Sequence, residues 1–168
     1  SGIYSDGDDV APELTPSDTG VILSTGRARD ITNSGNDANR SSSTSNQMGR
    51  DGDDDLNAIA GTQTHDAAVF EAEFIPAGET LTMQVVFSSE EYLEYVGSGF
   101  NDAVGIWVNG VKAELTVGDG DITINNINDQ SNENLYIDNP ANAEIANTEM
   151  DGFTVTMTLK APVIPGQV

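Results

Sequence analysis

Acidic side chains crowd one turn of this chain, between two apolar segments that have the alternating pattern of β-strands. Residues 86–109 read VFSSEEYLEYVGSGFNDAVGIWVN and contain no Lys, Arg or His that could neutralise these charges. Carboxylate and amide oxygens are the ligands that Ca²⁺ prefers. The spacing predicts a calcium site at one end of a sandwich, with Glu90, Glu91, Asn101 and Asp102 as ligands. The alternative is that Glu91 and Glu94 merely face solvent.

A second acidic cluster precedes these residues in the chain. Asp51, Asp53 and Asp55 repeat the D-x-D-x-D beginning of an EF-hand loop. Leu56 and Thr62 replace the glycine and the glutamate that the rest of that loop requires, so an EF-hand is excluded. Repulsion among neighbouring carboxylates still favours a bound Ca²⁺. The alternative is a solvated acidic loop.

Aromatic side chains in the first acidic turn could contact a sugar or a peptide; the candidates are Tyr92, Tyr95 and Phe100. Catalysis is not expected. Glu90 and Glu91 are adjacent and would point to opposite faces of a strand, which is a poor arrangement for the paired carboxylates of a glycosidase. The single histidine, His65, is expected to be a loop residue. A secreted hydrolase that uses carboxylates is therefore only a third alternative to binding or structural roles.

The charge of the chain excludes several partners. Its 168 residues include 28 acidic and 6 basic side chains, a formal net charge of −22. Nucleic acid is excluded as a partner because its binding depends on Lys and Arg, and no apolar run is long enough to span a membrane. Without cysteine there is no disulfide, and Ca²⁺ would reduce the self-repulsion of the compact chain. We expect a monomer.

The apolar pattern predicts an all-β fold, an antiparallel β-sandwich or jelly roll with long Asp/Asn/Gly-rich loops and little helix. Residues 1–19 are expected to form a polar lead-in or linker, and residues 20–168 a single calcium-binding domain, with a long loop over 26–55. Alternation over 67–74 and 81–87, separated by Pro76-Ala77-Gly78, predicts a hairpin. Further strands are expected at 104–108, at 112–117 and at 153–160, with Asn109-Gly110 as a hairpin turn.

The central motif resembles that of the choice-of-anchor L domain. The matching residues are Phe87, Ser89, Glu90, Glu91, Tyr92, Glu94, Tyr95, Val96, Ser98, Phe100, Asn101, Asp102 and Gly105, with further similar pieces at 20–26, 52–56, 64–69, 124–128 and 151–154. The resemblance implies an extracellular module of a large bacterial surface protein. Its likeness to modules of calcium-dependent RTX-type adhesins implies neighbouring adhesin domains and a peptide or carbohydrate ligand on a host or neighbouring cell. The alternative is a scaffold or spacer whose Ca²⁺ serves stability alone.

The chain departs from this family's pattern after its Thr-rich strand. Members usually continue with a further strand, whereas this sequence stops at Pro165-Gly166-Gln167-Val168. The missing closing strand predicts an unpaired sheet edge near Phe153–Lys160 or Val104–Val108. Another chain or segment would fill that edge by β-augmentation.

Overall fold

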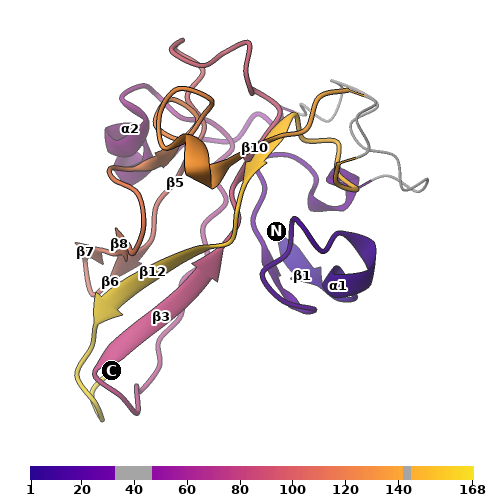
Figure 1. The fold of residues 1–168 in the computed structure, drawn as a ribbon. Coiled ribbons are helices and arrows are strands. Elements are labelled where there is room, and N and C mark those ends of the chain that lie inside the picture. The colour runs from indigo at the N-terminus through magenta and orange to yellow at the C-terminus, as the bar shows by residue number, and fades with distance from the viewer. Residues whose placement is uncertain (33–46, 142–144) are drawn as a thin grey trace.

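The computed structural model describes residues 1–32, 47–141 and 145–168 of the chain. They form short antiparallel strands grouped in several small sheets, with little helix, as the all-β prediction requires (Figure 1). Part of the expected loop over 26–55, residues 33–46, lies outside the described residues.

The longest strand pair joins β3 (Thr80–Val85) to β12 (Met157–Pro162), and β8 (Glu114–Leu115) lies on the other side of β12. Side chains along β3 alternate between exposed and half-buried, and those of β12 between buried and more exposed. This alternation follows from the period of two of a pleated strand, which turns one face to the core. The cleanest sequence pattern in the chain therefore marks a central strand.

A second sheet has the order β10 (Tyr136–Asp138), β11 (Gly152–Thr154) and β4 (Ser88–Ser89). The expected strand over 153–160 is thus two strands in two sheets, separated at Val155 and Thr156. Antiparallel pairing sets Gly152 opposite Ser89. That register brings the residue before β11 close to the residue after β4, which matters for the acidic turn.

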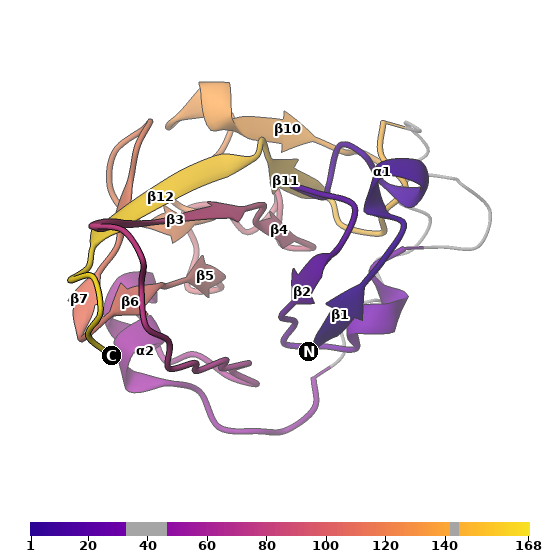
Figure 2. The ribbon, with the colours of Figure 1, turned by 90° about the horizontal axis from the view of Figure 1, so that it is seen from below.

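The region expected as a polar lead-in is packed into the fold. β1 (Gly2–Tyr4) pairs with β2 (Gly20–Ile22), and α1 (Gly7–Val10) lies between them in the chain (Figure 2). Ala11 and Leu14 are buried in a small hydrophobic cluster with Phe153 and Ala146. Residues 1–19 are therefore part of the domain in structural terms.

Two short pairs complete the sheets: β5 (Ala103–Val104) with β9 (Ile122–Thr123), and β6 (Trp107–Val108) with β7 (Val111–Lys112). Asn109 and Gly110 have positive φ angles of 51° and 77° between β6 and β7. Two consecutive positive φ angles are what a tight hairpin turn of the Asn-Gly type requires. The hairpin prediction at this position is confirmed.

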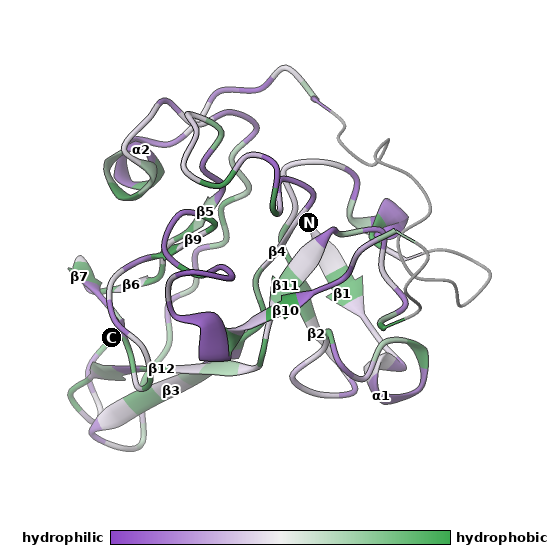
Figure 3. Cartoon of the chain, turned by 45° about the horizontal axis from the view of Figure 1, so that its top comes forward, coloured by the Kyte–Doolittle hydropathy of each residue, from purple (hydrophilic) through white to green (hydrophobic). Residues whose placement is uncertain are grey.

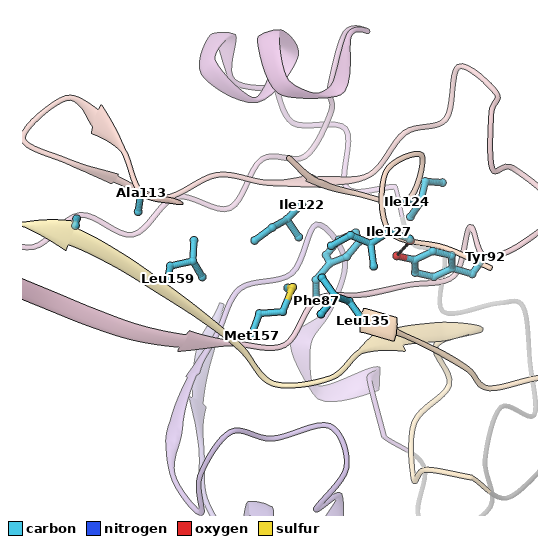
Figure 4. Packing of buried hydrophobic residues seen from close by; sticks show 10 residues of the cluster. Phe87, Tyr92, Ala113, Ile122, Ile124, Ile127, Leu135, Met157 and Leu159 are labelled. Carbon is cyan, nitrogen blue, oxygen red and sulfur yellow. Dashed lines mark hydrogen bonds between the residues drawn. The ribbon is translucent and has the colours of Figure 1, made fainter. Parts of the chain in front are cut away.

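In the part of the chain that the structure describes, helical structure is limited to α1, to α2 (Asp54–Ala60), and to the 3₁₀ turns η1 (Ala28–Asp30) and η3 (Glu133–Leu135). The main hydrophobic core lies between β12 and the loops that follow β4 and β9. It contains Phe87, Tyr92, Ile122, Ile124, Ile127, Leu135, Met157 and Leu159 (Figure 4). Its members come from distant parts of the chain, so tertiary packing holds these short strands together.

One predicted strand is wrong. Residues 67–76 belong to no strand, and the hairpin expected with 81–87 is not formed. Instead the segment runs away from β3 (Figure 2) and leaves Val69, Phe70, Phe74 and Ile75 between 45% and 66% exposed. Alternation in sequence shows only that a segment fits a pleated surface, and here no described segment provides the paired partner.

The open edge expected at one of two places does not lie at Phe153–Lys160, because β11 and β12 each have a strand on both sides. At the other predicted place, Val104–Val108, β5 and β6 each have one neighbour. Among the described strands, β3 is the longest that is paired on one side only.

Candidate functional site

The acidic turn begins directly after β4 and ends at β5, so two strands fix its ends. The Ser89 hydroxyl donates to Asp102 Oδ2 at 2.7 Å and accepts from the Glu91 N–H at 2.9 Å. One buried serine therefore joins the beginning of the turn to its end. Of the predicted ligands, Glu90, Glu91 and Asp102 are brought into one neighbourhood.

Glu90 carries the most unusual carboxylate in this neighbourhood. Both of its oxygens are shielded from solvent and have no hydrogen-bond partner among the described residues. Burial, followed by the negative charges of Asp151 and Glu149, raises the pKa of Glu90 from 4.5 to about 8. A buried carboxylate without a donor is costly in its charged form, so it needs a proton or a cation.

Two further carboxylates join the site from a part of the chain that the sequence patterns did not associate with it. Glu149 is 7% exposed, and Asp151 immediately precedes Gly152, the partner of Ser89 across the sheet. Both raise the pKa of Glu90 through their charge. Only the register between β11 and β4 could have identified them, and that register is not visible in the spacing of the residues.

The remaining members of the cluster show the same electrostatic crowding. Burial and then the charge of Asp102 raise the pKa of Glu91. Burial also raises the pKa of Asp102, and its hydrogen bond from Ser89 partly opposes that effect. We name the set Glu90, Glu91, Asp102, Glu149 and Asp151 the acidic cluster.

The acidic cluster is not a preformed coordination sphere. Within the described ranges, no three acidic or histidine side chains are placed so that they could hold a metal ion together. Charge repulsion acts over longer distances than coordination, which explains how these carboxylates shift one another's pKa without converging on one point. A cation would have to draw them together.

Asn101, the fourth predicted ligand, is engaged in structural hydrogen bonds. Its amide nitrogen donates to the Ala60 carbonyl at 2.8 Å, and its amide oxygen accepts from the Asn125 N–H at 3.1 Å. The side chain thereby ties α2 to the loop after β9. Both ends of the amide take part in these bonds, so Asn101 helps to position the turn beside the cluster, and its role as a calcium ligand stays a prediction.

The three aromatic candidates differ in exposure. Tyr92 is 1% exposed, and its hydroxyl donates to the Ile127 carbonyl at 2.8 Å inside the core (Figure 4). Tyr95 and Phe100 are 42% and 64% exposed and pack edge to face with ring centroids 5.3 Å apart. Only this second pair presents aromatic surface to a ligand.

The other acidic segment is organised around a helix start. Asp53 caps α2, accepting hydrogen bonds from the N–H groups of Asp55 and Leu56. Asp51 lies in an isolated β-bridge with His65, and Asp55 is exposed in the first turn of the helix. Helix capping accounts for the Asp53 carboxylate by itself, because the first N–H groups of a helix need acceptors.

Between β9 and β10 the chain is rich in asparagine and strongly hydrophilic (Figure 3). Asn128 is buried, donating to the Ile124 carbonyl and accepting from the N–H groups of Gln130 and Ser131. Asn126 donates to the carbonyls of Asp119 and Asp121. These amides satisfy the backbone of their own turns, which is the usual role of Asn side chains in turns.

Comparison with models of protein families identifies the family of this chain. A model of the choice-of-anchor L domain matches residues 6–168. Searches of curated proteins and of solved structures gave no match. The family indicates a surface-associated or extracellular protein, and no helix in the described part of the chain is long and apolar enough to cross a membrane.

Proposed function

Because this chain belongs to the choice-of-anchor L family, we propose that it is a calcium-binding module of a bacterial surface adhesin. In this proposal the acidic cluster binds Ca²⁺, and the module binds a peptide or glycan ligand in a calcium-dependent way. RTX-type adhesins, in which such modules act beside neighbouring domains, are the proposed context.

The observation that carries the calcium proposal is the Glu90 carboxylate, which is shielded from solvent without a donor among four other acidic side chains. Carboxylates accept hydrogen bonds and donate none when ionised, so these groups cannot satisfy one another. Ca²⁺ accepts six to eight oxygen ligands in flexible geometry, which suits a cluster that must rearrange around it.

The exposed ring pair supports the ligand-binding part of the proposal. Tyr95 and Phe100 lie in the same turn that carries Glu90 and Glu91. Aromatic surface is suited to a sugar ring or an apolar peptide side chain. A ligand carboxylate or a pair of hydroxyls could add oxygen ligands to Ca²⁺ held beside these rings.

A titration calorimeter tests the calcium proposal. We expect one or more Ca²⁺ ions to bind wild type, Mg²⁺ to bind more weakly, and Glu90→Gln and Asp102→Asn to lower the calcium affinity at least tenfold. Glu114→Gln, an exposed charge change on β8, is the matched control and should bind as wild type. Equal affinity of Glu90→Gln and wild type would remove the acidic cluster as the site.

A spacer whose Ca²⁺ serves stability alone is the second candidate. The solvent-shielded position of the Glu90 oxygens favours it, since a buried ion has no open coordination position for a ligand. A glycan and peptide array with calcium and with EDTA separates the two. Calcium-dependent binding that is lost in Tyr95→Ser and Phe100→Ser supports the adhesin, and no binding in either condition supports the spacer.

A further inference from the structure

The outer edge of β3 has backbone hydrogen-bonding groups that no described strand uses. The Thr116 N–H donates to the Thr158 carbonyl at 2.9 Å, so Thr158 directs its backbone groups towards β8. Successive residues of an antiparallel strand alternate in direction, so Met157, Leu159 and Ala161 bond to β3. Their register partners on β3 are Val85, Met83 and Leu81.

The alternation then fixes which groups of β3 point away from β12. They are the N–H and C=O groups of Thr80, Thr82 and Gln84. The Val163 N–H donates to the Glu79 carbonyl at 3.0 Å, which continues the same ladder and agrees with this assignment. Within the described residues, no strand pairs with this edge and no other backbone hydrogen bond reaches it.

We propose that the outer edge of β3 is a docking site for an extended peptide segment that alternates apolar with basic residues and adds a strand beside Thr80, Thr82 and Gln84. This inference goes beyond the calcium-dependent function, because it concerns a different face of the molecule and needs no cation. Main-chain hydrogen bonds would hold the peptide, and its alternate side chains would select it.

The side chains of β3 determine the apolar half of this pattern. Met83 and Val85 pack against the main core yet remain half-buried, and Leu81 on the same face is also only half-buried. A strand added beside them would place alternate side chains on this face, where apolar groups would cover the remaining surface. On the other face, Thr82 and Gln84 are exposed and neutral, so the charge that a docked peptide meets on this face comes from neighbouring residues.

Charge complementarity determines that the other residues of the peptide are basic. The chain carries a net charge of −22, and Glu79 precedes β3 directly. Lys160, opposite Thr82 on β12, lies two strand spacings (about 10 Å) from an added strand and is a single positive charge against this excess of negative charge. The same net charge disfavours a second copy of this chain as the occupant, since two strongly acidic surfaces repel each other.

Residues 70–75 are the competing occupant within the chain. If they folded back across the turn at 76–79, Glu73 would lie opposite Thr82, and Phe74 and Ala72 would face Leu81 and Met83. In the structure this segment stays unpaired and its phenylalanines are exposed. The test must therefore separate an edge that is open to a peptide from an edge closed by this segment.

The probes are three eight-residue synthetic peptides in which valine alternates with lysine, threonine or glutamate, labelled with a fluorophore at one end. Fluorescence anisotropy at low salt should give the tightest binding for the lysine peptide, weaker binding for threonine and the weakest for glutamate. Binding should be the same with calcium and with EDTA, which separates this result from that of the calcium proposal. Absence of binding by all three peptides, or equal binding, would overturn the inference.

Thr82→Pro locates the site. Proline removes an N–H that the fold does not use, and edge strands tolerate it there. We expect the variant to fold as wild type and to bind the lysine peptide at least about fivefold more weakly, which corresponds to one lost hydrogen bond of ~1 kcal/mol. Thr82→Val keeps the N–H and is the matched control. Unchanged binding by a folded Thr82→Pro would place the peptide elsewhere.

A disulfide lock tests the competing occupant. The chain has no cysteine, so Glu73→Cys with Thr82→Cys introduces one possible bridge. Ala72→Cys with Thr82→Cys is the control, because its side chains would lie on opposite faces of such a hairpin. If the variant with Glu73→Cys and Thr82→Cys oxidises spontaneously in the buffer used for wild type and does not bind the lysine peptide, residues 70–75 close the edge. The proposal then fails. Peptide binding that survives reduction and is lost on oxidation supports it.

Discussion

Asp66 and Glu90 are both carboxylates shielded from solvent, but they differ in the hydrogen-bond donors around them. Asp66 is 6% exposed and accepts from the N–H groups of Arg50 at 2.6 Å and Met48 at 2.8 Å. These bonds, the one from Arg50 first, lower the pKa of Asp66. Glu90 has no such donor, and burial among negative charges raises its pKa to about 8.

The comparison shows that burial alone does not decide how a carboxylate behaves. Backbone N–H groups stabilise the charged form of Asp66, so this side chain organises the loop that ends at β-bridge residue Asp51. Glu90 is destabilised in its charged form and is therefore suited to bind something positive. The first carboxylate holds the structure together, and the second is the better candidate for a functional group.

The largest expected effect concerns Asp66. Asp66→Asn replaces one accepting oxygen with an NH₂ group, which must face an N–H donor of the loop. We expect the melting temperature to fall by roughly 5–10 °C in calcium-free buffer, since a buried donor loses its partner. Differential scanning calorimetry beside Glu114→Gln measures this. A variant that melts within 2 °C of wild type would show that the loop does not depend on these bonds.

Glu90 should give an effect of the opposite sign that depends on pH. Its folded pKa of about 8 exceeds the ordinary value of 4.5, so between these values the folded state binds more protons than the unfolded state. Calcium-free wild type should therefore lose stability as pH rises from about 5 to 8 and change little from this group above that range. After allowance for solvent screening, the loss is on the order of 2 kcal/mol.

Glu90→Gln removes the ionisation and should flatten this part of the pH profile. Urea unfolding at pH 5 and pH 8 measures both proteins, with Glu114→Gln as the control for a lost surface charge. We expect Glu90→Gln to be more stable than calcium-free wild type at pH 8 and close to it at pH 5. The reverse order at pH 8 would mean that the Glu90 carboxylate has a donor after all.

The smallest expected effect concerns Asp53, whose carboxylate caps α2 in the other acidic segment and, like Asp66, accepts from backbone N–H groups. Asp53→Ala should cost ~1 kcal/mol, the usual loss for a helix N-cap, and lower the melting temperature by about 2–4 °C. Asp53→Asn keeps a capping side chain and should melt near wild type. If Asp53→Asn loses calcium affinity while its melting temperature holds, Asp53 is a ligand as well as a cap.

Much of the architecture was predictable because it depends on local chemistry. The hairpin at Asn109-Gly110 forms because few residue pairs adopt two positive φ angles, and the alternation over 157–162 is that of a central strand. The family motif placed Glu90, Glu91 and Asp102 in one turn, and the structure keeps these three together.

What tertiary structure decided is how segments far apart in the chain are paired. The register of β11 against β4 brings Asp151 and Glu149 close to Glu90. Core packing buries Tyr92, which the sequence pattern predicted as a ligand contact. Residues 70–75 carry a strand pattern but have no partner, so their pattern alone produced a wrong strand. Residue type and spacing determine what a segment can form, whereas burial and the directions of backbone groups depend on which neighbours the fold supplies.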